Sequence, residues 1–182
     1  MKSLPLLTFL ALILTTILTT RAAFSSENDS FACYKKGEAD PYIYDDIGAR
    51  YLSILCSNAP SADSPIDCYK NAIGDIYFSD LLYNKHLAFL CSQARSDAPI
   101  DCFKMAYEDN TIRDLIGSPL RIVGLCGAAT SQQPVVCFLE RLNAGEANDA
   151  DGQPVYINKL IRLCSKNPSI LDYIRENMVP QR

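Results

Sequence analysis

The sequence contains a single histidine, and its eight cysteines include no Cys-x-x-Cys pair. Nucleophilic triads and most zinc sites use histidine, and zinc knuckles place two cysteines close together. His86 has no conspicuous catalytic partner, so we interpret it as a surface or half-buried helical residue. These absences argue against a triad enzyme and against a zinc centre. The sequence therefore predicts no metal ion, no cofactor and no identifiable catalytic residue.

Clusters of basic residues are absent too. The chain has 17 Lys and Arg residues against 21 Asp and Glu residues, a formal net charge of −4. Binding to nucleic acid or to an anionic membrane depends on concentrated positive charge. We therefore expect no nucleic-acid partner.

Long apolar runs are missing except at the N-terminus. Lys2 is followed by the largely apolar stretch Leu4–Leu18, and small residues follow around Ala22. This pattern predicts a secretory signal peptide at Met1–Ala23, and the run is too short and too rich in threonine for a membrane span. We therefore expect a secreted or periplasmic protein with no membrane span in the mature chain.

The chain is dominated by a repeated segment that carries the cysteines. The stretch LCSNAPSADSPIDCYKNA begins at Leu55, returns at Leu90 as LCSQARSDAPIDCFKMA and at Leu125 as LCGAATSQQPVVCFLER, and a shorter echo begins at Leu163. Self-similarity at a fixed period is the signature of a repeat architecture. The blocks of 34–35 residues are Phe31–Pro65, Ile66–Pro99, Ile100–Pro134 and Val135–Pro168.

The sequence of each block predicts two helices joined by a turn. Apolar residues stand four and one positions before the second cysteine, on one helical face: Leu52/Leu55, Leu87/Leu90, Ile122/Leu125 and Leu160/Leu163. A proline then marks the start of the next helix. We expect turns between the helices at Ala39–Asp45, Ile76–Asp80, Asp109–Asp114 and Ala144–Gln153.

The predicted fold is therefore all-α, a short α-solenoid of about four disulfide-bridged αα-hairpin repeats. After the signal peptide at residues 1–23 we expect a frayed polar leader at 24–30, the repeat domain at 31–177 and a C-terminal tail at 178–182.

Eight cysteines in an exported chain predict disulfides. Bonds within the blocks leave none unpaired: Cys33–Cys56, Cys68–Cys91, Cys102–Cys126 and Cys137–Cys164. In a rival scheme the bonds cross the proline turns and join Cys56–Cys68, Cys91–Cys102 and Cys126–Cys137. This scheme leaves Cys33 and Cys164 unpaired. We favour the within-block scheme, because it also explains why the last segment has Leu171 where a further block would open with cysteine.

Stacked, disulfide-bonded hairpins with the motif LCSxA…PIDCYK in an exported chain resemble the cysteine-rich members of the Sel-one-like repeat family, relatives of the tetratricopeptide solenoids. The resemblance is one of architecture and spans Cys33 to Asn177. It implies a superhelical scaffold that binds proteins or peptides.

Several residues invite a chemical interpretation. The acidic segment Asn148–Gly152 fails the register of an EF-hand calcium loop. Asp67 and Asp101 recur at helix starts, where negative charge is stabilising. The aromatic residues that follow the first cysteine of each block are expected in the core: Tyr34, Tyr69, Phe103 and Phe138. Other tyrosines stand near inter-helix turns and would serve either packing or binding: Tyr42, Tyr44, Tyr77, Tyr83 and Tyr107.

Three functions compete. The first is a non-enzymatic module that binds an extracytoplasmic protein or peptide, for example as an inhibitor or adaptor. The second is a hydrolase of envelope or extracellular polymers that uses Asp/Glu chemistry, and the third is a structural envelope component. A binding module predicts an exposed patch of residues that differ between the blocks. An enzyme predicts a concave pocket with two carboxyl groups of perturbed pKa.

Overall fold

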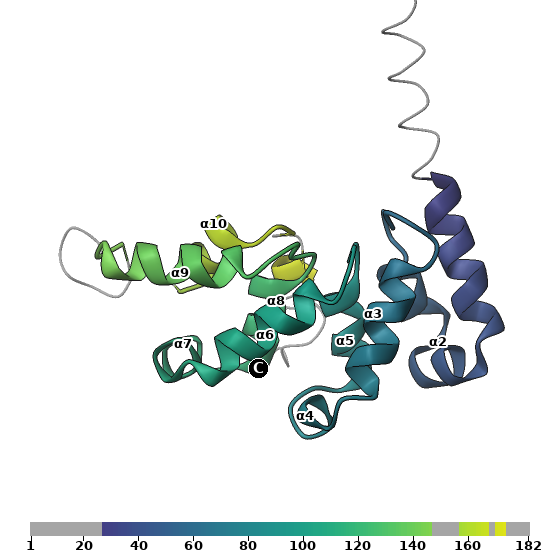
Figure 1. Cartoon of the computed structure of the whole chain (residues 1–182), viewed down its shortest axis with the longest axis horizontal. Coiled ribbons are helices and arrows are strands. Elements are labelled where there is room, and N and C mark those ends of the chain that lie inside the picture. The colour runs from purple at the N-terminus through teal and green to yellow at the C-terminus, as the bar shows by residue number, and fades with distance from the viewer. Residues whose placement is uncertain (1–26, 147–156, 168–169, 174–182) are drawn as a thin grey trace, which may run out of the picture.

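The computed structural model describes residues 27–146, 157–167 and 170–173 (Figure 1). Within these ranges every regular element is a helix, which confirms the all-α prediction. The predicted signal peptide, the acidic segment Asn148–Gly152 and the tail at 178–182 lie outside the described residues.

The helices follow one another in a row along the long axis of the molecule, from purple to green in Figure 1. The yellow C-terminal part then turns back to the middle of the row, next to α8. A helix over residues 27–39 comes first, and a short helical segment at 170–173 comes last. Between them lie α2 (Pro41–Leu55), α3 (Ser64–Ile73), α4 (Ile76–Ser79), α5 (Asn84–Cys91), α6 (Ala98–Glu108), α7 (Asn110–Ile116), α8 (Pro119–Cys126), α9 (Gln133–Asn143) and α10 (Ile157–Cys164).

The blocks correspond to four structural units, which we number 1 to 4 in chain order. Units 2 to 4 begin at the N-cap residues of their opening helices, which are Asp63, Asp97 and Gln132. A long opening helix leads into a returning helix, and one cysteine of the unit lies on the opening helix and the other at the C-terminal end of the returning helix. The opening helix of unit 1 includes residues 27–30, so the expected frayed leader is wrong for these residues. Ser30 is already part of the fold, because its hydroxyl accepts a hydrogen bond from the Ala59 backbone N–H at 3.1 Å.

The segments expected as simple turns contain short helices instead. In units 2 and 3 these are α4 and α7, and in unit 1 the first part of α2 takes this place before Gly48 interrupts the helix with φ +66°. Each begins at an aspartate whose side chain accepts a hydrogen bond from the backbone two or three residues on: Asp40, Asp75 and Asp109. Aspartate is a preferred N-cap, so a carboxylate at each of these points starts a helix.

The core is built largely from the predicted positions. Tyr69, Phe103 and Phe138 are fully buried, whereas Tyr34 is only half-buried. The apolar pairs of the returning helices are buried in units 1 to 3. In unit 4 Leu160 is buried but Leu163 is 51% exposed, so the predicted pairing is wrong there.

All eight cysteines are bonded, and the four bonds are the within-block set that the repeat favours. They join Cys33 to Cys56, Cys68 to Cys91, Cys102 to Cys126 and Cys137 to Cys164, with Cα–Cα distances of 5.5 to 5.6 Å. Each bond ties the opening helix of a unit to its own returning helix. Neighbouring units are therefore held together by noncovalent contacts alone, apart from the chain itself.

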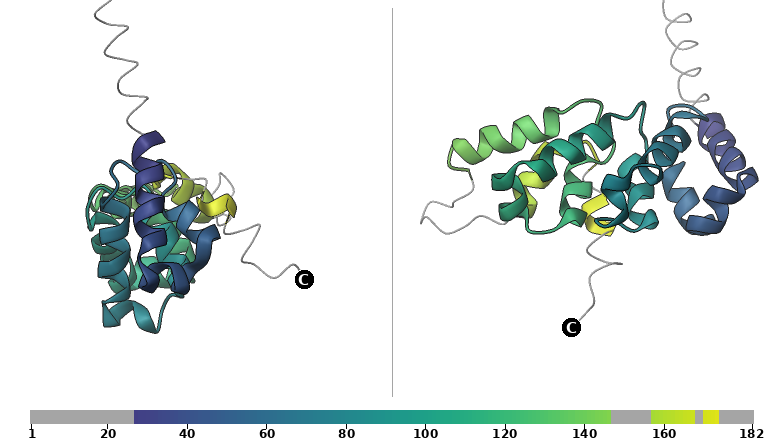
Figure 2. Two further views of the ribbon diagram at one scale, coloured as in Figure 1. Left: turned by 90° about the vertical axis from the view of Figure 1, so that its right-hand side faces the viewer. Right: turned by 60° about the horizontal axis from the view of Figure 1, so that its bottom comes forward.

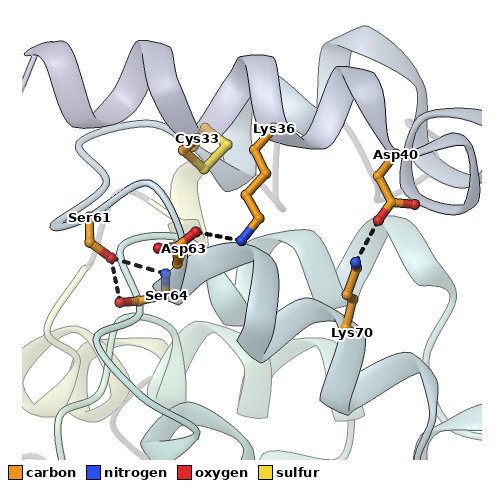
Figure 3. Close-up of polar contacts among 8 residues, drawn as sticks. Cys33, Lys36, Asp40, Ser61, Asp63, Ser64 and Lys70 are labelled. Atoms are coloured by element: carbon orange, nitrogen blue, oxygen red, sulfur yellow. Dashed lines mark hydrogen bonds and ion pairs between the residues drawn. A yellow bond between two sulfur atoms is a disulfide. The ribbon is translucent and has the colours of Figure 1, made fainter.

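Two polar contacts recur between neighbouring units. Between units 1 and 2, Lys36 pairs with Asp63, and Lys70 pairs with Asp40 at 2.5 Å (Figure 3). At the equivalent positions between units 2 and 3, Asn71 donates to Asp97 at 2.9 Å and Lys104 pairs with Asp75. Between units 3 and 4 these positions hold Met105 with Gln132 and Leu139 with Asp109, and neither combination can form an ion pair.

Asp40 both caps α2 and pairs with Lys70, so two substitutions separate its roles. Asp40→Asn keeps a good N-cap and loses only an ion pair near the surface, which costs at most about 1 kcal/mol. Asp40→Ala loses both, and we expect a further cost of about 1 kcal/mol from the missing cap. Urea denaturation measures both losses. Equal stability of the two variants would contradict the capping role.

Candidate functional site

Exposed aromatic residues gather where unit 1 meets unit 2. Two adjoining hollows there share Asp46: one is lined by Pro41, Tyr42 and Asp45, and the other by residues of α2 and the start of α5. We name this region the tyrosine surface. Its residues are Tyr42, Asp45, Asp46, Tyr51, Tyr83, Asn84 and Lys85.

Two tyrosines project from this surface. The side chain of Tyr42 is 84% exposed and that of Tyr83 is 74% exposed. Both stand at helix starts: Tyr42 lies in the first turn of α2, and Tyr83 is the N-cap residue of α5. The ammonium group of Lys85 lies 5.4 Å from the centroid of the Tyr83 ring, within cation–π range. Large aromatic side chains held on rigid elements are typical of binding surfaces.

Asp46 is an exposed residue of the tyrosine surface that links three helices. Its carboxylate accepts hydrogen bonds from the Tyr69 hydroxyl at 2.8 Å and from the Asn84 amide at 2.5 Å. Burial, and then the bond to Asp46, raise the pKa of Tyr69 well above its usual value. Tyr69 therefore stays protonated and acts as a donor. These bonds fix α2 against α3 and α5, so the Asp46 carboxylate holds the surface in shape.

His86 is a buried residue that stabilises the same surface through Tyr83. It is only 6% exposed, so the predicted surface or half-buried position is wrong. Its Nδ1 accepts a hydrogen bond from the Tyr83 backbone N–H at 3.3 Å, which places the ring proton on Nε2. Burial lowers the pKa of His86 to about 4, and the nearby charge of Lys85 adds to this effect. Neutral His86 thus caps the start of α5 and orients Tyr83.

The two exposed tyrosines stand at repeat positions that hold different residues in different units. Tyr42 stands two residues after its capping aspartate, and the equivalent residues of units 2 and 3 are Tyr77 and Thr111. Tyr83 stands eight residues before the second cysteine of its unit, and its equivalents are Gly48 in unit 1, Ser118 in unit 3 and Tyr156 in unit 4. The exposed patch is therefore built from positions that vary while the scaffold around it repeats.

The remaining tyrosines near the turns take different roles. Tyr77 and Tyr107 are half-buried and meet edge to face with ring centroids 6.0 Å apart, and Tyr107 also stacks on Phe103. These two are packing residues. Tyr44 is 37% exposed on α2 and lines neither hollow of the tyrosine surface. The sequence placed all these tyrosines near the turns but could not separate the outward-facing pair from the others.

The carboxyl groups of Asp40 and Asp75, whose pKa is lowered, form ion pairs that stabilise the fold. The hydrogen bond from Lys70 lowers the pKa of Asp40, and that from Lys104 lowers the pKa of Asp75. A lowered pKa suits a permanent ion pair and is the opposite of what a general acid needs. Asp67 and Asp101 lie exposed in the first turns of α3 and α6, as their spacing predicts.

The described residues contain no group of three or more His, Cys, Asp or Glu side chains placed to hold a metal ion. In the same part of the chain, no helix combines the length and the apolar character that crossing a bilayer requires. Comparisons with protein-family models, with curated proteins and with solved structures found no match.

Proposed function

We propose that this chain is an exported, non-enzymatic protein-binding module, a short α-solenoid that contacts a protein partner through the tyrosine surface. The observation that supports it most directly is the pair of exposed tyrosines, Tyr42 and Tyr83, at positions where the residue changes from unit to unit. Tyr77, which takes the place of Tyr42 in unit 2, is half-buried and packs against Tyr107. Side chains as exposed as those of Tyr42 and Tyr83 contribute little to the packing of one unit on the next. A binding role accounts for them.

The disulfides support an extracytoplasmic location. Four bonds join all eight cysteines, and such bonds form and persist in oxidising compartments. Export through the N-terminal segment at residues 1–23 and kinship with the Sel-one-like and tetratricopeptide solenoids are parts of this proposal. In this proposal the chain acts as an inhibitor or an adaptor of an extracytoplasmic protein.

The test compares capture of a partner by the mature protein and by a Tyr42→Ala/Tyr83→Ala variant. Truncation of an interface aromatic costs about 1–4 kcal/mol, so we expect the pair to weaken binding by at least about tenfold. Proteins retained from the extracytoplasmic fraction are quantified, and the affinity of the retained partner is then measured by calorimetry. Both substituted side chains are exposed, so the variant should fold normally.

The matched control is Ile76→Ala. Ile76 is 87% exposed on α4 and belongs to neither hollow of the tyrosine surface. This variant should retain the partner like the unmodified protein. A partner held equally well by all three proteins would refute the role of the tyrosine surface.

A further inference from the structure

The ends of the returning helices line a groove that crosses the units. Its lining residues stand two positions before and one and two positions after the second cysteine of each unit. They are Ile54, Ser57 and Asn58 in unit 1 and Phe89, Ser92 and Gln93 in unit 2. Gly124 and Gly127, at the equivalent positions of unit 3, lie against the C-terminal segment. Asn58, Gln93 and Ala128 share a left-handed backbone with φ of 51°, 59° and 60°, so the chain makes the same turn at each unit.

The chain's own C-terminal segment occupies the unit 3 end of this groove. A Cβ atom on Gly124 would overlap the Leu171 side chain, and one on Gly127 would lie 2.5 Å from Cδ1 of Ile170. Only glycine at these two positions leaves room for the segment. Ser165, which precedes the segment in the chain, is also bound to unit 3. Its hydroxyl donates a hydrogen bond to the Gly124 carbonyl at 2.7 Å.

The segment continues from unit 3 towards unit 1. The Tyr173 ring lies 4.8 Å from the Phe89 ring of unit 2, measured between centroids. The Arg50 guanidinium of unit 1 lies 5.7 Å from the centroid of the Tyr173 ring. Four residues, 170–173, thus contact three units, and Figure 2 shows this yellow segment among the returning helices.

This segment is not a fifth unit. In units 1 to 3, eight or nine positions separate the second cysteine from the next helix-starting proline, but Pro168 follows Cys164 by only four. Leu171 also stands where a further unit would open with cysteine. Because the connection is short, residues 170–173 return to units 1 to 3. The segment occupies the groove there in the way that a bound peptide would.

The unit 1 and unit 2 end of the groove is a cavity with polar and apolar walls. Ile54, Phe89 and Tyr173 supply apolar surface. The side-chain amides of Asn58 and Gln93 also line it, and no hydrogen bond of either amide is found among the described residues. An amide offers two donors and an acceptor, which matches the unpaired backbone N–H and C=O groups at the ends of a short helix.

We propose that this groove is a peptide-binding site, distinct from the tyrosine surface, for a short helical segment of a partner protein. The partner segment places a branched apolar side chain against Gly127 and an aromatic one, three residues later, against Phe89. Ile170 and Tyr173 of the chain itself hold these places and act as a resident competitor. Residues three apart share one helix face, which is the usual pattern of a helix that binds in a groove.

The resident segment competes with an incoming peptide for the groove, so it lowers the apparent affinity of that peptide. A short tether gives a bound segment an effective concentration in the millimolar range. A partner peptide with the same side chains therefore binds the intact protein weakly, and it binds tightly once the resident side chains are removed.

The experiment uses a fluorescent synthetic peptide with the sequence of residues 165–177, SKNPSILDYIREN, and the disulfide-bonded full chain. Fluorescence anisotropy measures binding to the wild type and to an Ile170→Ala/Tyr173→Ala variant. Because the variant loses the resident competitor, we expect the peptide to bind it at least about tenfold more tightly. A peptide with the same two alanine substitutions should lose this affinity.

A second variant tests the groove wall. Asn58→Gly/Gln93→Gly, added to the first variant, removes both amides and keeps a residue that tolerates positive φ. Loss of two hydrogen bonds should weaken peptide binding by about fivefold or more. Tyr42→Ala/Tyr83→Ala should leave peptide binding unchanged, so the groove and the tyrosine surface are tested separately. Unchanged binding after removal of the amides, or weaker binding after removal of the tyrosines, would overturn the proposal.

The proposal also fails if the Ile170→Ala/Tyr173→Ala protein keeps its helical circular dichroism and does not bind the peptide at millimolar concentration. If that variant does not fold, hydrogen exchange of the wild type with excess peptide decides the question. Displacement of the resident segment should change amide protection at residues 89–93 and 170–173. Unchanged protection would show that the groove is only a packing surface.

Discussion

Replacing Cys68 and Cys91 with alanine should lower the free energy of unfolding by about 3 kcal/mol, because the bond closes a loop with a sequence separation of 23 residues. Unit 2 lies between two neighbours, so loosening it exposes apolar surface on both sides. Urea denaturation under non-reducing conditions measures the loss. Peptide mapping should recover the other three bonds intact.

The matched control is Cys137→Ala/Cys164→Ala in unit 4. Its loop is slightly longer, with a separation of 27 residues, so the loop-entropy cost is similar. Unit 4 lies at the end of the row and lacks the two polar contacts that link the earlier units. Its variant should therefore melt in two steps, with an early local transition. A single transition with the same midpoint in both variants would contradict this view of the units.

Acidification from pH 6.5 to pH 4 should lower the free energy of unfolding by about 3 kcal/mol through His86 alone. The unfolded chain takes up a proton at the ordinary pKa of 6.5, whereas burial holds the folded pKa at about 4. The stabilising effect is complete above pH 6.5 and is lost as the pH falls towards 4. Protonation at Nδ1 would also break the hydrogen bond from Tyr83.

His86→Asn is the control for this pH dependence. Its side-chain oxygen can accept the Tyr83 N–H in place of Nδ1 and does not titrate, so stability should be flat between pH 4.5 and pH 6.5. Asp40 and Asp75 do not interfere in this window. Their lowered pKa values mean that their contribution is lost only as the pH falls below about 4. A wild-type protein with no pH dependence above 4.5 would contradict the buried, neutral state of His86.

The fixed spacing of the cysteines made the fold and the disulfide pairing predictable. A proline after each second cysteine marked the opening helices, and the apolar pairs marked the returning helices. The short helices α4 and α7 were missed because their sequences are too short for a clear apolar period. The capping aspartates Asp75 and Asp109 were the available signal, and they recur at the repeat spacing.

The candidate site was only partly predictable. The tyrosines near the turns could be named, but the packing of neighbouring units decides that Tyr42 points outward while Tyr77 packs against Tyr107. His86 was misjudged because a lone histidine carries no periodic signal, and its burial depends on the cap it makes with Tyr83. The docking of Ile170 and Leu171 on Gly124 and Gly127 joins residues far apart in sequence, which local patterns do not reveal.

The returning C-terminal segment changes how such a row of units must fold. A linear array with contacts only between neighbours frays from its ends and folds from any point. Here residues 170–173 rest on units 1, 2 and 3, so the last part of the chain is tied to the first helices over more than 100 positions. Contacts at such separation raise the contact order and slow folding. They also hold residues 170–173 in place, because release of this segment requires contacts in the middle of the molecule to break.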